Sequence, residues 1–281
     1  REALTVHAWQ DESMTLAWEK RVRVQFEGDA HVQEDSCGFN GPNAWIVDGA
    51  TTLLEPLDLP AASNPQWLAQ QLNTVLAEST ASTGGVRALL AGVLSTIDVR
   101  ATELVGLERV RFPSAALSLA QLNEQGVEIA SLADCSVVVR THDGDTHLVR
   151  AELADTRVEL EAARRTVDAQ ERARLLCLDR ERRNTPGNVW VARREPEAAD
   201  HAHVVQLGPP ELMVMASDGA WRAVDLGIVA GLEQFLERTS TTLGALALLH
   251  ELRAHQERIG ELADDATILT LAPRPTPSPQ P

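Results

Sequence analysis

The sequence predicts an α+β fold in which pairs of helices cover mainly antiparallel sheets. One observation is the recurrence of short apolar or alternating runs, such as 22–26, 44–51 and 136–140, which are typical of strands. The other is two tandem helical patterns, at 63–97 and 225–256, in which apolar residues recur every three or four positions. A chain of 281 residues with 44% hydrophobic content can bury one large core, so we expect one main domain.

The N-terminal segment is expected to form antiparallel strands. Residues Thr5–Trp9 and Met14–Trp18 are typical of edge strands, and Val22–Phe26 alternates strictly between apolar and polar side chains. The apolar run 44–51 predicts a buried strand that ends on an acidic residue followed by glycine.

Two helices are expected after this buried strand. The first begins at Ser63-Asn64-Pro65, because Ser63 can cap a helix and proline suits its first turn. Beyond Gly84-Gly85, the apolar residues from Val86 to Ile97 predict a second helix. This pair could cover one face of a sheet.

The region 115–149 changes to a period of two. Strands are expected at 128–132 and 136–140, with a hairpin tip at His142–Asp145. That tip matches only the start of a calcium-binding loop, because the bidentate Glu of the twelfth position and the flanking helices are missing. We therefore expect a plain turn there.

The C-terminal half is expected to be mainly helical. A charged helix with a solvated face is predicted within 155–183, and helices at 225–236 and 241–256 would cover the other sheet. Between them, Val189–Ala192 indicates a short strand and 195–203 an acidic loop.

Acidic residues lie at the ends of three predicted strands. Asp48-Gly49 and Asp218-Gly219 each follow an apolar run, and Asp264-Asp265 precedes one. A single Asp-Gly pair is most simply a turn, but the recurrence predicts that three strand ends converge on one metal site. The carbonyl oxygen of Gly49 is accessible beside Asp48, because glycine has no side chain, so two hard oxygen donors are adjacent.

The composition excludes several classes of protein. The net charge of −16, from 41 acidic against 25 basic residues, argues against nucleic-acid binding and against adhesion to anionic membranes. No apolar run reaches the length of a membrane helix, and no signal peptide is evident. The three cysteines have neither disulfide-framework nor zinc-site spacing, so we expect a cytoplasmic protein.

Taken together, the acidic blocks resemble those of the metal-dependent protein phosphatases of the protein phosphatase 2C type. Five short blocks occur in the order of that family, and they are Gln33-Glu34-Asp35, Val47-Asp48-Gly49, Leu132-Ala133-Asp134-Cys135, Ala216-Ser217-Asp218-Gly219-Ala220-Trp221 and Asp264-Asp265. The resemblance implies a four-layer α-β-β-α sandwich, with two stacked, mainly antiparallel sheets flanked by helix pairs. It also implies a phosphatase-like domain over 1–272, with a flap-like insertion at about 150–203, before a Pro-rich tail at 273–281 that is expected to be an extended linker.

The resemblance further implies a phosphatase that uses a metal-activated water on a binuclear Mn²⁺ or Mg²⁺ centre. Asp48 would bridge the two ions, Gly49 would offer its carbonyl, and Asp218 and Asp264 would complete the shell of the first ion. Glu34 and Asp35 would act through waters, and Asp134 corresponds to a ligand of a third ion. Oxygen ligands without Cys or His favour Mg²⁺ or Mn²⁺ over Zn²⁺. The implied substrate is a phosphoprotein carrying phosphoserine or phosphothreonine, or a phosphorylated small molecule.

The sequence departs from this family at two positions that bear on catalysis. Ala50 replaces the histidine proposed as general acid, and Ala30 aligns with the arginine that clamps the phosphate. Arg222 is our candidate for a substitute clamp, because it lies four residues after Asp218, although it also stands where an acid for a third ion is expected. The other candidates are His31, Arg23 and the basic face around Arg182 and Arg183.

These departures leave alternatives open. A rival hypothesis is a phosphatase-fold regulatory module that binds metal or a phosphorylated partner without efficient turnover. The choice between Asp264 and Asp265 as the ligand also stays open.

Overall fold

Ten strands form two antiparallel sheets in the computed structural model, which describes residues 14–50, 54–79, 84–152 and 168–277. The first sheet has the order β1-β10-β9-β6-β7, and these strands span Met14–Phe26, Ala266–Pro277, Pro210–Ala216, Ser136–Thr141 and Thr146–Val149. The second sheet has the order β2-β3-β4-β5-β8, and these strands span Ser36–Asn40, Asn43–Gly49, Ala115–Asn123, Gly126–Leu132 and His203–Leu207.

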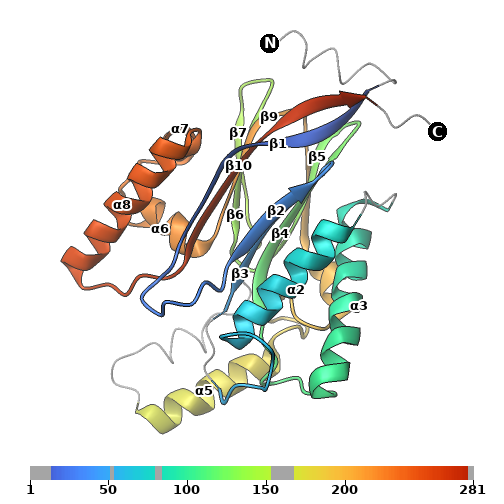
Figure 1. Ribbon diagram of the computed structural model, residues 1–281, viewed down its shortest axis with the longest axis vertical. Coiled ribbons are helices and arrows are strands. Elements are labelled where there is room, and N and C mark those ends of the chain that lie inside the picture. Colours follow the sequence, from blue (N-terminus) through green and yellow to red (C-terminus); the bar gives the residue numbers. More distant parts are fainter. Residues whose placement is uncertain (1–13, 51–53, 80–83, 153–167, 278–281) are drawn as a thin grey trace.

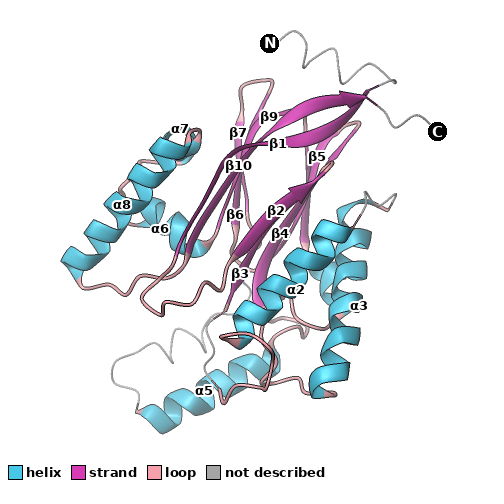
Figure 2. Ribbon diagram, viewed as in Figure 1, coloured by secondary structure: helices cyan, strands magenta, loops and turns pink. Residues whose placement is uncertain are grey.

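Helices cover the outer faces of both sheets (Figures 1 and 2). The helices α2 (Asn64–Glu78) and α3 (Gly85–Val105) pack on the second sheet. The helices α6 (Asp218–Asp225), α7 (Leu232–Thr239) and α8 (Thr242–Ile259) pack on the first sheet. The predicted four-layer sandwich is therefore confirmed. None of the helices in the described residues is long and apolar enough to cross a membrane.

Three apolar cores lie between the four layers, and alternation along each strand divides its side chains between them. In β3, Trp45 and Val47 pack under α2 and α3, whereas Ile46 packs against the other sheet. Asp48 lies two residues after Ile46, so its side chain points to the same side of the strand. The strand thus directs it to the space between the sheets near the strand end. The period of two thus places a carboxylate between the layers.

The helix starts follow local capping rules. The Ser63 hydroxyl accepts a hydrogen bond from the Gln66 N–H at 3.2 Å at the start of α2, and the Thr241 hydroxyl accepts from the Gly244 N–H at 3.2 Å before α8. The helix α8 ends where Gly260 adopts a left-handed conformation. The starts of α2 and α8 therefore match the prediction to within one residue.

Three predicted elements are corrected by the structure. The strands expected at 14–18 and 22–26 are one strand, β1, because a bulge between Lys20 and Val22 absorbs the break in alternation. The helix expected at 225–236 is interrupted, since Gly227 and Gly231 have positive φ angles between α6 and α7. Only a single bridge, from Ala192 to Ala115, occupies the strand expected at 189–192.

The Pro-rich tail is also corrected where it is described. The strand β10 continues to Pro277 and pairs with β1. In an antiparallel ladder only every second residue directs its N–H at a given partner, so prolines at alternate positions are compatible with pairing on one side. The predicted strand Thr5–Trp9 lies outside the described residues.

The segment expected to be a flap contains a helix that lies beyond the ends of β3 and β4. This helix, α5 (Ala169–Arg182), is separate from the two helical layers (Figure 1). Asp168 caps its start, and a short 3₁₀ helix at Pro196–His201 follows in place of the expected acidic loop. The C-terminal end of α5 takes part in the candidate site.

Candidate functional site

A cavity of about 220 Å³ lies where the sandwich meets the C-terminal end of α5. Four carboxylates from the sandwich line it, together with the backbone of Gly49, and they are Asp48, Asp134, Asp218 and Asp264. The structure thus brings all three acidic strand ends of the sequence analysis to one place. Asp134, which the resemblance implies as a ligand of a third ion, joins them from the turn between β5 and β6.

Asp48 and Asp218 are in direct contact. Asp48 is the second-last residue of β3, and Asp218 opens α6 one residue after β9, so both lie near a strand end between the layers. The backbone N–H of Asp218 donates a hydrogen bond of 3.0 Å to Oδ2 of Asp48. This bond joins the two sheets at the cavity.

The glycine after each of these aspartates allows a close backbone approach. A Cβ on Gly49 would lie 2.6 Å from the carbonyl oxygen of Glu34, and one on Gly219 would lie 1.9 Å from the carbonyl oxygen of Asp265. Neither position has room for a side chain. The two Asp-Gly pairs therefore do more than make turns, because they let the other acidic blocks pack against Asp48 and Asp218.

Asp264 and Asp265 have different surroundings. The carboxylate of Asp265 is buried and accepts hydrogen bonds from the backbone N–H groups of Gly28 at 2.7 Å and Glu34 at 2.5 Å. Asp264 lines the cavity, whereas Asp265 does not. Asp265 consequently holds two loops together, and Asp264 is the residue of this pair that a ligand in the cavity can reach.

Glu34 and Asp35 lie beside the cavity, outside its lining. The Ser63 hydroxyl at the start of α2 donates a hydrogen bond to the Glu34 carboxylate. Asp35 is 6% exposed, and its Oδ2 atom has no hydrogen-bond partner among the described residues. An unpaired buried carboxylate oxygen is costly unless a bound ion or water completes its surroundings.

Comparison with known proteins gives a result only at the level of structure. No family model matches the sequence, and no curated protein matches it. Among solved structures, the chain is similar to the serine/threonine phosphatase PstP of Mycobacterium tuberculosis, with a TM-score of 0.58 and 14% identity over 92% of this chain and 98% of that one. It is also similar to the catalytic domain of PstP in complex with two manganese ions, with a TM-score of 0.56 and 15% identity over 92% of this chain and 99% of that one.

A third similar structure is the serine/threonine phosphatase Stp1 of Staphylococcus aureus, with a TM-score of 0.54 and 13% identity over 93% of this chain and 98% of that one. The chain has the fold of the protein phosphatase 2C-type phosphatases. The likeness covers almost the whole length of both chains, so the phosphatase-like fold implied by the acidic blocks is confirmed.

Within this phosphatase fold, burial and the charges of neighbouring acids raise the pKa values of Asp35, Asp48, Asp218 and Asp264. Burial, followed by the charge of Asp218, raises the pKa of Asp48 well above its usual value. Burial and the charge of Asp134 raise the pKa of Asp218 to about 6, and burial raises that of Asp35 to about 8. Burial also raises the pKa of Asp264. These groups repel one another unless protons or cations neutralise them.

The donor set fits a hard divalent cation. It consists of carboxylate oxygens and the Gly49 carbonyl, which are the donors that Mg²⁺ and related ions prefer. In the described part of the chain, no three Asp, Glu, His or Cys side chains lie close enough to hold an ion by themselves. An ion here would therefore need the Gly49 carbonyl and several waters as further ligands. Mg²⁺ usually keeps several waters when it binds to a protein.

The arginine predicted as phosphate clamp is not at this cavity. Arg222 donates two hydrogen bonds of 2.8 Å to Glu261, and it is absent from the lining. Arg23 and His31 do not line the cavity either. The guanidinium group of Arg222 is paired with Glu261 on the loop after α8. The spacing between Arg222 and Asp218 gives no information about a partner so distant in sequence.

Other basic residues line the cavity instead. Arg180 and Arg183 lie at the C-terminal end of α5, with Asp179 beside them. Arg183 belongs to the basic face proposed as a fallback, whereas Arg180 and Asp179 were missed. Their spacing by three and four residues predicts one helix face, but nothing local to the sequence indicates what that face would meet.

Proposed function

We propose that the chain is a metal-dependent phosphatase that hydrolyses phosphoserine and phosphothreonine, or a small phosphate ester. The observation that supports this most is the meeting of four carboxylates, from four separate segments, around one cavity in a phosphatase fold. The raised pKa values of Asp48, Asp218 and Asp264 support a cavity that favours added positive charge. A purely structural role does not account for so many acids around one cavity.

The residues have distinct roles in this proposal. Asp48, the Gly49 carbonyl, Asp218 and Asp264 would hold two ions, and Asp134 would be available to a third. Glu34 and Asp35 act through waters from beside the cavity. When bound, Mn²⁺ or Mg²⁺ would supply the Lewis acidity that hydrolysis of a phosphate ester needs.

The histidine that the resemblance implies as proton donor to the leaving group is missing. Ala50 lines the cavity at the position where the resemblance implies a histidine, and it cannot donate a proton. The leaving group of an aryl phosphate is a stabilised phenolate, which can depart unprotonated. The alkoxide of serine or threonine needs a proton to depart. We therefore expect the chain to hydrolyse aryl phosphates faster than phosphothreonine peptides.

Hydrolysis assays test this proposal. The purified protein with Mn²⁺ should release phosphate from p-nitrophenyl phosphate and, more slowly, from a phosphothreonine peptide. Asp48→Asn should lower kcat/KM on the order of 100-fold or more, because it removes the shared ligand. Asp143→Asn, at the exposed tip between β6 and β7, is the matched control and should leave activity unchanged. Equal activity in the wild type and Asp48→Asn would contradict the proposal.

A second candidate is a regulatory module that binds a phosphorylated partner with little turnover. The absence of both the general acid and the usual clamp, at Ala50 and Ala30, favours it. The two candidates differ in one result. A module of this kind binds Mn²⁺ and phosphopeptide but releases no phosphate from either substrate.

A further inference from the structure

The C-terminal end of α5 brings two arginines to the cavity that contains the acids. Arg180 and Arg183 are 7% and 9% exposed, and both line the cavity. The Ser114 hydroxyl, beside the start of β4, accepts from Arg183 Nη1 at 2.7 Å and from Arg180 Nη1 at 3.4 Å. The two guanidinium groups are thus held side by side at the cavity wall.

Arg183 keeps a donor for a ligand. Arg183 directs Nε to Asp179 at 3.0 Å and Nη1 to Ser114, while its Nη2 makes no hydrogen bond to any residue that the structure describes. Asp179 also lies 3.9 Å from Arg180 Nη1. The carboxylate of Asp179 thus lies between two guanidinium groups that line the same cavity as the acids.

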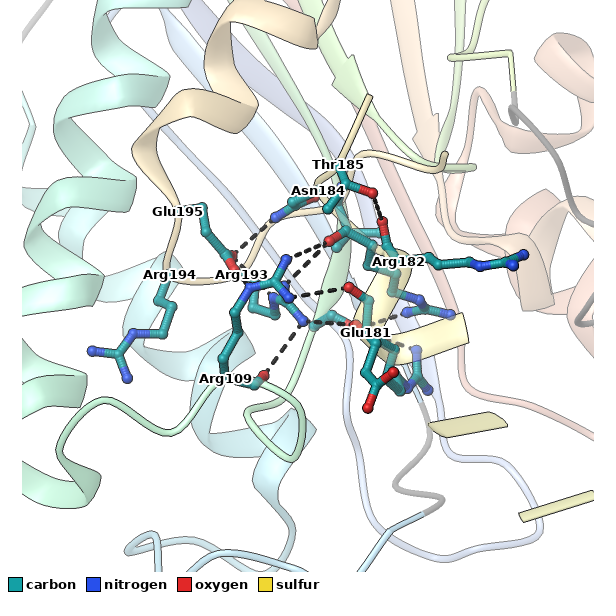
Figure 3. Close-up of polar contacts among 12 residues, drawn as sticks. Arg109, Glu181, Arg182, Asn184, Thr185, Arg193, Arg194 and Glu195 are labelled. Atoms are coloured by element: carbon teal, nitrogen blue, oxygen red, sulfur yellow. Dashed lines mark hydrogen bonds and ion pairs between the residues drawn. The ribbon is translucent and has the colours of Figure 1, made fainter. Parts of the chain in front are cut away.

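A buried network fixes the end of the helix that carries them (Figure 3). The side chain of Arg193 is fully buried and donates to both oxygens of Glu195, at 2.9 and 2.6 Å. Arg109 donates to the same carboxylate at 3.1 Å. Although burial acts to raise the pKa of Glu195, the hydrogen bonds and charge of Arg193 hold it below its usual value. Glu195 therefore stays ionised between the two arginines.

The same two arginines bind the carbonyls at the helix end. Arg109 donates to the carbonyl of Glu181 at 3.0 Å (Figure 3). It also donates to the carbonyl of Arg183 at 2.9 Å, and Arg193 donates to that of Arg180 at 3.3 Å. Carbonyls in the last turn of a helix lack partners within the helix, and the negative end of its dipole favours cations. The network thereby fixes the backbone of both residues that face the cavity.

We propose that Arg180 and Arg183 form the phosphate-binding clamp of this site. They would take the place of the clamping arginine, whose position is occupied by Ala30 in this chain. The inference rests on the proposed function and specifies how the substrate is held. A guanidinium fork matches the spacing of two phosphate oxygens, and each charge-assisted bond is stronger where water is excluded. Acids from the sheets and arginines from α5 then bind the ions and the phosphate from different sides of one cavity.

The test measures phosphate binding separately from turnover. Inorganic phosphate is titrated calorimetrically into the Mn²⁺-loaded protein, and the Mn²⁺ affinity is measured in a separate titration. Arg183→Ala and Arg180→Ala should each weaken phosphate binding by roughly 10- to 100-fold, the loss expected for a charged hydrogen bond. The Mn²⁺ affinity should stay within about twofold, because neither arginine supplies an oxygen donor. Arg222→Ala is the matched control and should bind phosphate like the wild type.

Each arginine also has a conservative variant, in case truncation disturbs folding. Arg183→Lys and Arg180→Lys keep the charge and most of the buried stem but lose the fork, so they should bind phosphate more weakly than the wild type while unfolding at a similar temperature. With aryl phosphate as substrate, the loss should occur mainly in KM.

The outcomes separate this inference from the proposed function. Normal Mn²⁺ binding with wild-type phosphate affinity in the variants of both arginines overturns the clamp alone. A wild-type protein that binds no Mn²⁺ overturns the proposed function and the clamp with it. Weaker phosphate binding in Arg222→Ala, but not in the α5 variants, would return the role to Arg222.

Discussion

The buried acids at and beside the cavity should make the stability of the metal-free protein depend on pH. Asp35 and Asp218 have pKa values raised to about 8 and about 6 in the folded protein, whereas in the unfolded chain they titrate near 4. Between these values the folded state binds more protons than the unfolded state, so the free energy of unfolding falls as the pH rises. Urea unfolding with a chelator present should therefore show lower stability at pH 8 than at pH 5.5.

Two additions make this pH prediction specific. Asp35→Asn should flatten the dependence, because the variant has no proton to release at that position. Mn²⁺ should restore stability at pH 8 by neutralising the same acids. A metal-free protein that is equally or more stable at pH 8 would show that these carboxyl groups are not crowded as described.

The glycine after Asp218 gives a second test at the scale of single residues. A methyl group at Gly219 would lie 1.9 Å from the Asp265 carbonyl oxygen, so Gly219→Ala must displace the backbone and should cost roughly 3 kcal/mol or more. Gly92 lies on the exposed side of α3, where an added Cβ would meet nothing within 4 Å beyond the backbone of its own helix. Gly92→Ala should therefore stabilise the protein by about 0.5–1 kcal/mol. Denaturant unfolding measures both. Similar effects of the two substitutions would mean that the acidic blocks are not packed as tightly as described.

At the scale of elements, local chemistry determines which predictions match the structure. The helices α2 and α8 begin within a residue of their predicted starts because Ser63 and Thr241 cap them locally. The division into α6 and α7 was missed, because the pattern of apolar residues continues across Gly227 and Gly231. The prediction of two strands in place of the single strand β1 was also wrong, because a bulge depends on the partner strand and not on the strand itself.

The attachment of α5 depends on long-range contacts, and this leads to a prediction about stability. Glu195 accepts from Arg193, whose side chain is fully buried, and from Arg109. Glu195→Ala leaves a buried guanidinium without its carboxylate and should cost about 3–5 kcal/mol. In a double-mutant cycle with Arg193→Ala, the combined loss should be smaller than the sum by about 0.5–3 kcal/mol.

A control for this cycle lies on β1. Arg21→Ala breaks the exposed pair with Glu19, which should leave the free energy of unfolding unchanged within error. Strict additivity of the Arg193 and Glu195 substitutions would indicate that the two side chains do not act as one unit.

At the scale of the whole molecule, the acids of the site were predictable and the basic side was not. Asp48, Asp218 and Asp264 are marked by strand ends and glycines, so short patterns place them. The choice of Asp264 over Asp265 needed the contacts of Asp265 with Gly28 and Glu34, which are distant in sequence. Arg180 was missed because its position depends on where α5 attaches, and that depends on Arg109 and Arg193.

The central claim is that the four acids around the cavity form a divalent cation site. Calorimetric titration of Mn²⁺ tests it most directly, because it requires neither a substrate nor turnover. The wild type should bind about two ions per chain, Asp48→Asn should lose this binding, and Asp143→Asn at the exposed hairpin tip should bind like the wild type. A wild-type protein that binds no Mn²⁺, or an Asp48→Asn variant that binds it as tightly as the wild type, would contradict the claim.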